Sequence, residues 1–150
     1  MRFKHISLKN AETFVTDGGE KSAFLVTSDD TDGRVTVADS FLPNGASAPW
    51  HYHEIDDELF YVISGTVEFG VNDKLIVAEA GDLVMAGPRV RRRFTALTDS
   101  RVVVINAPAG PAEGFIRDIS HQWRLAVSAP SVRCWLRFHA VPSTAITCGG

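Results

Sequence analysis

The residues best suited to chemistry lie in one short stretch, 51–58. His51 and His53 are two positions apart, and residues at positions i and i+2 of a strand point to the same face. A short acidic turn follows, and a second predicted strand opens with Glu58. A hairpin between the two strands would bring the Glu58 carboxylate near both imidazoles. Two neutral histidines and one carboxylate are the ligand set of a 2-His-1-carboxylate metal site. The alternative is a surface turn that carries these histidines by chance.

The spacing around these three residues resembles the first signature motif of the cupin superfamily. That motif is a glycine, five residues, His-x-His, three or four residues, Glu, six residues and a second glycine. Its fixed positions are met by Gly45, His51, His53, Glu58 and Gly65. The resemblance implies an all-β fold, the cupin jelly-roll barrel or double-stranded β-helix. It also implies that His51, His53 and Glu58 hold a divalent metal (Fe, Mn, Ni or Zn) inside that barrel.

The second cupin motif is present only in part. It reads Gly-Asp, four residues, Pro-x-Gly, two residues, His, three residues, Asn. Gly81 and the aspartate after it match the opening, but the proline arrives one residue late, and Arg89 stands at the second glycine position. Counting forward from Gly81 and backward from Phe94 both place Arg92 where the family has its histidine. Alignment on the proline would place Arg93 there instead, and we prefer Arg92 because two counts agree.

An arginine at this position changes the chemistry of the site. A guanidinium stays protonated and has no lone pair, so it cannot bind a cation. Strand alternation groups Arg92 with Val90 and Phe94, the more apolar face, which predicts that Arg92 points into the barrel. There it would pair with Glu58, in a bidentate pair if the geometry allows, and would weaken metal binding. An outward Arg92 would leave a plain three-ligand site at His51, His53 and Glu58.

The composition is that of an ordinary globular domain. The chain has 150 residues, a length that predicts one domain over 1–150. Its formal net charge of −3 does not favour binding to nucleic acid or to an anionic membrane. No apolar run is long enough to span a bilayer, and the N-terminus has no signal-peptide pattern. We therefore expect a cytoplasmic protein without nucleic-acid or membrane partners, in which Cys134 and Cys148 are free thiols.

The elements that must position the site are short strands. Apolar, β-branched and aromatic runs separated by turn residues predict an all-β sandwich or barrel over roughly 20–107. The predicted strands are 22–27, 35–41, 58–64, 66–71, 74–78, 83–86, 90–96 and 102–105, with turns at 17–20, 29–33 and 72–73. The first ten residues give only a weak strand pattern.

The pattern changes after the last predicted strand. Phe115, Ile119 and Trp123 recur every four residues, which predicts an amphipathic helix over roughly 112–127 that packs its apolar face on the barrel or on a partner chain. The run 108–115 resembles the segment after the barrel in quercetinase-like small cupins. A tail over 128–150 follows, with no recognised pattern. Small cupins are commonly homodimers, so the resemblance also implies a homodimer.

Other residues around the histidines are predicted to shape the pocket. Alternation places Trp50 and Tyr52 on the face opposite the ligands. Phe60 and Val62 share the parity of Glu58 and are expected to wall an apolar pocket, and Met85 is expected either to join them or to pack in the core.

Three functions remain open at this point. The first is a metal-dependent, quercetinase-like dioxygenase that acts on a small aromatic or polyketide-like substrate through His51, His53 and Glu58. The second is a metal-free or weakly metallated isomerase, cyclase or lyase in which His51 or His53 is the general base and Arg92 anchors an anionic oxygen. The third is a non-catalytic cupin that binds a small ligand. The fold alone does not choose between them.

Overall fold

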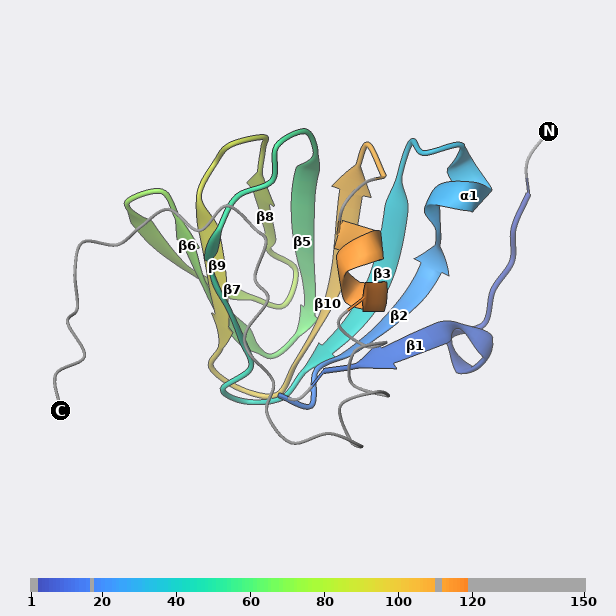
Figure 1. Cartoon of the computed structure of the whole chain (residues 1–150). Helices are drawn as coiled ribbons and strands as arrows, with labels where there is room; N and C mark the ends of the chain where they lie inside the picture. The colour runs from blue at the N-terminus through green and yellow to red at the C-terminus, as the bar shows by residue number, and fades with distance from the viewer. Residues whose placement is uncertain (1–2, 17, 110–111, 119–150) are drawn as a thin grey trace, which may run out of the picture.

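Two antiparallel sheets form the described part of the protein (Figure 1). The structure is a computed structural model and describes residues 3–16, 18–109 and 112–118. The first sheet has the order β1 (Glu12–Val15), β2 (Lys21–Val26), β3 (Thr36–Leu42), β10 (Ser100–Ala107), β5 (Asp57–Ser64) and β8 (Leu83–Ala86). The second has the order β4 (Ser47–His51), β9 (Arg92–Ala96), β6 (Thr66–Val71) and β7 (Lys74–Glu79). The predicted all-β jelly-roll barrel is confirmed.

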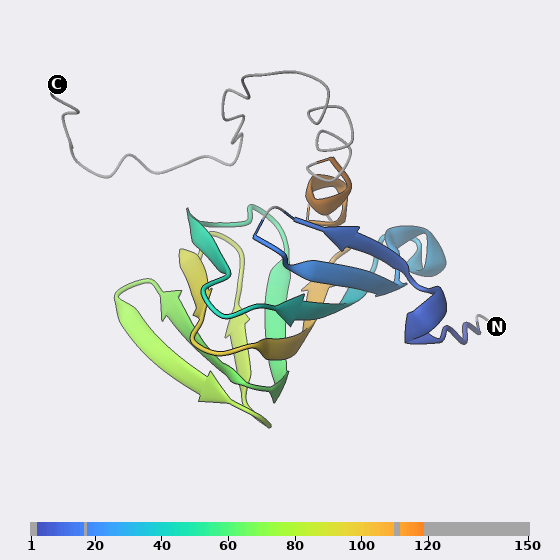
Figure 2. The same cartoon turned by 90° about the horizontal axis from the view of Figure 1, so that it is seen from below.

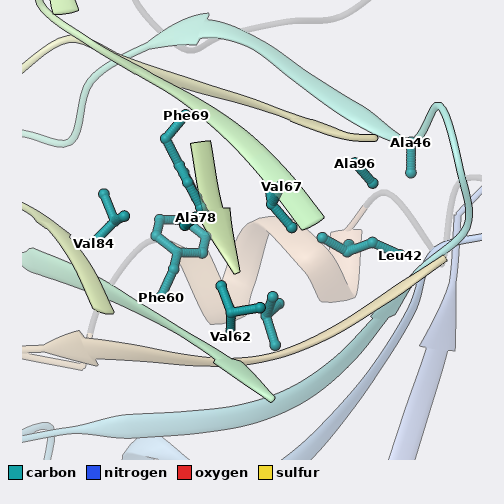
Figure 3. Close-up of a cluster of buried hydrophobic side chains, with 10 residues drawn as sticks. Leu42, Ala46, Phe60, Val62, Val67, Phe69, Ala78, Val84 and Ala96 are labelled. Atoms are coloured by element: carbon teal, nitrogen blue, oxygen red, sulfur yellow. The ribbon is translucent and has the colours of Figure 1, made fainter. Parts of the chain in front are cut away.

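The two sheets face each other and enclose a core at one end of the barrel. Figure 2, viewed from below, shows the sheets on either side of this space. Strand β5 illustrates the alternation: Phe60 and Val62 are buried, whereas Tyr61 and Ile63 are exposed. Figure 3 shows Val62, Val67 and Phe69 in the cluster between the sheets. Burying such side chains stabilises the fold by about 1.5–3 kcal/mol each.

The alternation also explains one wrong prediction. Met85 neither lines a pocket nor packs in the core, because it is 56% exposed. It pairs with Leu59 in register, while Ala86 pairs with Glu58 and Val84 with Phe60. Cross-strand partners share a face, so Met85 points outward from the edge strand β8.

The predicted turns lie where the backbone requires them. Asn72 between β6 and β7 has φ of 51°, and Gly65 between β5 and β6 has φ of 84°. A side chain on Gly65 would overlap the Asp99 carbonyl and Ser100, so the motif glycine is needed for both space and conformation.

Short elements at the N-terminal end went largely unpredicted. These are a 3-10 helix (Leu8–Asn10), strand β1 and helix α1 (Ser28–Thr31). Sequence reasoning gave a turn at the position of α1. There Thr27 and Asp30 form a reciprocal capping box, which stabilises one helical turn within the loop.

The chain after the barrel folds back onto the strands. Residues 112–118 form a helix, which agrees with the start of the predicted helix over 112–127. Glu113 accepts a hydrogen bond from the Ser28 backbone N–H at 2.8 Å, and the Arg117 guanidinium lies over the Phe14 and Phe24 rings.

Several predictions fall on residues outside the described part of the chain. They are the remainder of the helix with Ile119 and Trp123, the tail over 128–150 and the two cysteines. Among the described residues, no helix has the length and apolar character of a membrane span.

Candidate metal centre

His51, His53 and Glu58 converge at one end of the barrel, as predicted. One ligand atom from each lies within 4.8 Å of the others. His51 is the last residue of β4, His53 lies in the loop after it, and Glu58 is the second residue of β5. The His53 Nε2 atom is 3.8 Å from Glu58 Oε2. The histidines therefore meet although only His51 lies in the strand.

Hydrogen bonds fix which ring nitrogen of each histidine carries a proton. His51 Nδ1 is 2.7 Å from the Pro49 carbonyl oxygen, and His53 Nδ1 is 2.8 Å from Asp56 Oδ2. Since both partners are acceptors, each Nδ1 carries a proton and donates it, so the lone pair of each ring in its neutral form is on Nε2. Burial lowers the pKa of His51 most, and the hydrogen bond to Pro49 raises it in part, leaving the pKa below its ordinary value. A neutral imidazole is the form that binds a metal.

Asp56 and Asn106 hold this arrangement and were missed by sequence reasoning. Asp56 is fully buried, and its Oδ2 also accepts a hydrogen bond from Asn106 Nδ2 at 2.9 Å. Asn106 Nδ2 is 3.4 Å from Glu58 Oε1 as well, because Asn106 and Glu58 are cross-strand partners of β10 and β5. Burial raises the pKa of the Asp56 carboxyl, but the hydrogen bond and charge of His53 outweigh it and leave the pKa below its ordinary value.

From the sequence alone, Asp56 is one residue of the acidic turn over 54–57. The sequence gives one signal for its role, a carboxylate three residues after a candidate ligand histidine. A carboxylate bonded to the distal nitrogen of a ligand histidine is the usual support of a metal site.

Arg92 points into the barrel beside Glu58, as predicted. It is 3% exposed, and its Nη1 donates to Glu58 Oε2 at 3.2 Å. Its other nitrogens donate to backbone carbonyls, Nη2 to Gly87 at 2.8 Å and Nε to Val90 at 3.3 Å. The bidentate pair that we considered is therefore not formed, because the guanidinium divides its donors among three acceptors.

The neighbouring arginine confirms the choice of register. Arg93 points outward, where its Nη2 donates to Glu68 at 2.7 Å and its guanidinium stacks on Trp50. His51 and Arg92 are paired across β4 and β9, and cross-strand partners share a face. Arg89, at the position of the family's second glycine, has φ of 61°, a conformation that glycine adopts at lower cost.

A cavity of about 240 Å³ lies against the histidines and Glu58. Aromatic rings supply much of its wall, and residues of the helix 112–118 close one side. Its apolar lining includes Phe14, Phe24, Phe60, Phe94, Val102, Val104, Phe115 and Ile116. The expectation for Phe60 is confirmed, whereas Val62 is fully buried in the core and is not among the described lining residues.

The Trp50 ring lies on the outer face of β4, opposite the ligands, as alternation predicts. The Arg91 and Arg93 guanidinium groups lie 5.2 and 5.6 Å from its centroid, and the residue is 37% exposed. The pairing of β4 with β9 shifts register between Ala48 and His51. Consecutive residues of β4, from Ala48 to His51, therefore all border the cavity.

The donor set fits a divalent transition metal. It supplies two imidazole nitrogens with lone pairs and one carboxylate, and Asp56 supports His53 from behind. Ligand atoms that share a metal lie about 3–4 Å apart when each bond is near 2.1 Å, so the separations here need only small side-chain movements. Arg92 opposes the ion by charge but leaves all three donors in place.

Comparisons with known proteins agree with this geometry. A family model described as a cupin domain matches residues 40–108. No curated protein sequence matches the chain.

Solved structures resemble the chain over most of its length. KdgF from Halomonas sp. has 18% sequence identity and a TM-score of 0.66, with 74% of this chain and 99% of that chain covered. An RmlC-like cupin from Shewanella frigidimarina has 22% identity and a TM-score of 0.64, with coverages of 75% and 99%. Ectoine synthase from P. lautus has 15% identity and a TM-score of 0.67, with coverages of 79% and 87%. At these identities the likeness concerns the fold.

Proposed function

Because the chain belongs to the cupin superfamily, we propose that it is a metal-dependent dioxygenase. Its substrate would be a small aromatic or polyketide-like molecule bound in the barrel cavity. One observation carries the proposal: two imidazoles and one carboxylate converge on the wall of a cavity lined by aromatic rings. A 2-His-1-carboxylate set leaves coordination positions open and is characteristic of non-haem iron oxygenases.

The residues of the chain have separate tasks in this proposal. His51, His53 and Glu58 hold the ion, which when bound supplies a Lewis acid and a binding position for dioxygen or a substrate oxygen. Asp56 holds the His53 ring in the tautomer that presents Nε2. The aromatic wall binds and orients the substrate and keeps bulk water away from the reacting end.

Arg92 is assigned a positioning role. It is not among the described residues that line the cavity, and its contact is with Glu58. Arg92 therefore orients the carboxylate and lowers the affinity of the site for a cation.

The test combines metal content with turnover. Protein purified without chelator or affinity metal is analysed for bound metals. It is then reloaded under anaerobic conditions with Fe(II), Mn(II), Ni(II) or Zn(II). Oxygen uptake is followed with a flavonol as the probe, and His53→Ala is compared with the exposed-face variant Arg93→Ala. We expect metal-dependent uptake that His53→Ala abolishes and Arg93→Ala retains. Tight metal binding without oxygen uptake by any loaded form would contradict the dioxygenase assignment.

A second candidate is favoured by the hydrogen bonds around His53. Asp56 and His53 form a buried pair that needs no metal to present a basic Nε2, as a general base requires. In this reading the protein is an isomerase, cyclase or lyase, and Arg92 holds the Glu58 side chain in place through their 3.2 Å contact. Analysis of the products by mass spectrometry before and after chelator treatment separates the two, because such an activity would consume no oxygen and would survive chelation.

The third function, binding without catalysis, would show ligand binding without turnover in either form. The homodimer, the cytoplasmic location and the absence of nucleic-acid and membrane partners stay predictions.

A further inference from the structure

The cavity has a second polar region on the wall formed by β2 and β3. Glu20, Ser22 and Ser40 all line it. Ser22 and Ser40 are buried, and their hydroxyl oxygens lie 2.8 Å apart. The Ser22 hydroxyl also lies close enough to the Glu20 carboxyl to lower its pKa. Glu20 precedes β2 and shares the inward parity of Ser22 and Phe24, so the polar group is continuous with the aromatic wall.

The register of the sheet places this region far from the metal centre. Ser40 pairs with Val102 of β10, and Val102 pairs with Val62 of β5. Glu58 lies four residues from Val62 along the same strand. Four residues of a strand span roughly 13 Å, and β2 and β3 lie beyond β10. A molecule that touches both regions must therefore be elongated.

The charges in the cavity restrict what this region accepts. Glu20 and Glu58 are lining residues, and no lysine or arginine is among the described residues of the lining. A substrate carboxylate next to Glu20 would meet like charge in a poorly hydrated space, which is unfavourable. Burial raises the pKa of the Glu20 carboxyl, and the hydrogen bond from Ser22 lowers it only in part.

Building on the proposed function, we infer that Glu20, Ser22 and Ser40 form a recognition subsite for a neutral hydroxyl group at the far end of the substrate. A hydroxyl both donates and accepts, so it hydrogen-bonds to Glu20 in either protonation state and to the two serines. An ammonium group would require the ionised carboxylate. The subsite thus selects an elongated substrate with an apolar middle, a metal-directed oxygen at one end and a hydroxyl at the other.

The test uses probes of one shape with different ends. They are a biphenyl with hydroxyls at both ends, its monohydroxy analogue, and analogues in which a carboxylate or an aminomethyl group replaces the second hydroxyl. Binding is measured by isothermal titration calorimetry on chelator-treated protein, for the natural sequence, Glu20→Leu and Glu20→Gln. Glu79→Leu, on the exposed end of β7, is the matched control.

We expect the dihydroxy probe to bind about tenfold more tightly than the monohydroxy probe. A tenfold gain in affinity is what one hydrogen bond to a charged or polar buried partner typically contributes. Glu20→Leu should reduce that ratio to near one without weakening the monohydroxy probe, and Glu79→Leu should retain it. Glu20→Gln, which keeps the shape, should improve binding of the carboxylate probe. If Glu20→Leu does not fold, this gain is the deciding measurement.

Three results would overturn the inference. They are a ratio near one in the natural sequence, a ratio that Glu20→Leu leaves unchanged, and tighter binding of the aminomethyl probe than of the dihydroxy probe. Because these titrations need no metal, they test the subsite independently of the dioxygenase proposal. The dioxygenase proposal is tested by the metal and oxygen-uptake measurements.

Discussion

Replacing Arg92 by histidine should convert a weakened metal site into a stronger one. The guanidinium lies 3.2 Å from Glu58 Oε2, and a metal bound to that oxygen would lie about 2 Å from it. The ion would then be about 5 Å from a fixed positive charge. Arg92→His removes this charge and adds an imidazole where the family motif has its third histidine.

The size of the effect follows from Coulomb's law. A divalent ion and a guanidinium about 5 Å apart repel by roughly 2 kcal/mol at the dielectric constant of water and by roughly 7 kcal/mol at an effective value of 20. Even the lower figure corresponds to more than tenfold in affinity, before the additional ligand is counted. We therefore expect Arg92→His to bind Zn(II), Ni(II) and Mn(II) at least tenfold more tightly.

The assay is a calorimetric titration of both proteins after chelator treatment. Arg93→His is the matched control, because it makes the same substitution one residue away on the outer face. Arg92→Met distinguishes the effect of removing the positive charge from the effect of adding a ligand, since it removes the charge without supplying a ligand. In the metal-free state Arg92→His should also melt at a lower temperature, because Glu58 loses its buried partner, and metal should restore the loss. Equal affinities in the two proteins, or tight stoichiometric metal in the natural one, would refute the reasoning.

Three further predictions test the supports of the site and fold. Asp56→Asn should weaken metal binding about 10–100-fold, as loss of the carboxylate behind a ligand histidine typically does; an unchanged titration would remove Asp56 from the site. Gly65→Ala should lower the free energy of unfolding by at least about 2 kcal/mol, because the new methyl group would overlap its neighbours and the residue has a φ of 84°. Gly45→Ala has a similar φ of 87° but no neighbour near the new methyl group, so it should lower the free energy of unfolding by about 1 kcal/mol. Urea denaturation compares them, and equal losses would contradict the steric argument. For Glu113, burial raises the carboxyl pKa but hydrogen bonds from Ser28 and the Arg117 ion pair outweigh it, so the pKa lies below 4.5. A depressed carboxyl pKa contributes stability that is complete above pH 4.5 and is lost as the pH falls further. Below pH 4.5 the melting temperature of the natural protein should therefore fall more steeply than that of Glu113→Gln. An equal fall in the two proteins would contradict this prediction.

The barrel was predictable because its signals are local. Turn residues at Asn72 and Gly65 and alternating strands such as β5 reflect backbone conformation and burial on one face, both of which the sequence shows directly. Helix α1 was missed because its four residues read as a turn, and its stability comes from the cap between Thr27 and Asp30. The bulge in β4 was not predicted, because it is a property of strand pairing.

The residues of the site likewise comprise some that the sequence predicts and some that it does not. His51, His53 and Glu58 follow from spacing, and the inward Arg92 follows from parity and a motif count. Asn106 lies about fifty positions from its partners and joins them only through the register of β10 with β5. The subsite at Glu20 depends likewise on the pairing of β2 with β3. Contacts that depend on register across distant strands are not visible in a single sequence.

The balance of charge explains why an arginine is compatible with this centre. Asp56 and Glu58 bring two buried carboxylates to the site, and Arg92 is the guanidinium that pairs with Glu58. Without Arg92, the Glu58 carboxylate would lose its buried cationic partner when no metal is bound. Buried charges that lack a partner cost several kcal/mol each. Arg92 pairs with Glu58 and satisfies its remaining donors on Gly87 and Val90, which stabilises the ligand geometry in the absence of an ion. The same charge then opposes a cation that enters. Arg92 thus lowers the metal affinity of the site while it holds the ligands in place without a metal. The proposed function requires only that His51, His53 and Glu58 still bind the metal at its working concentration.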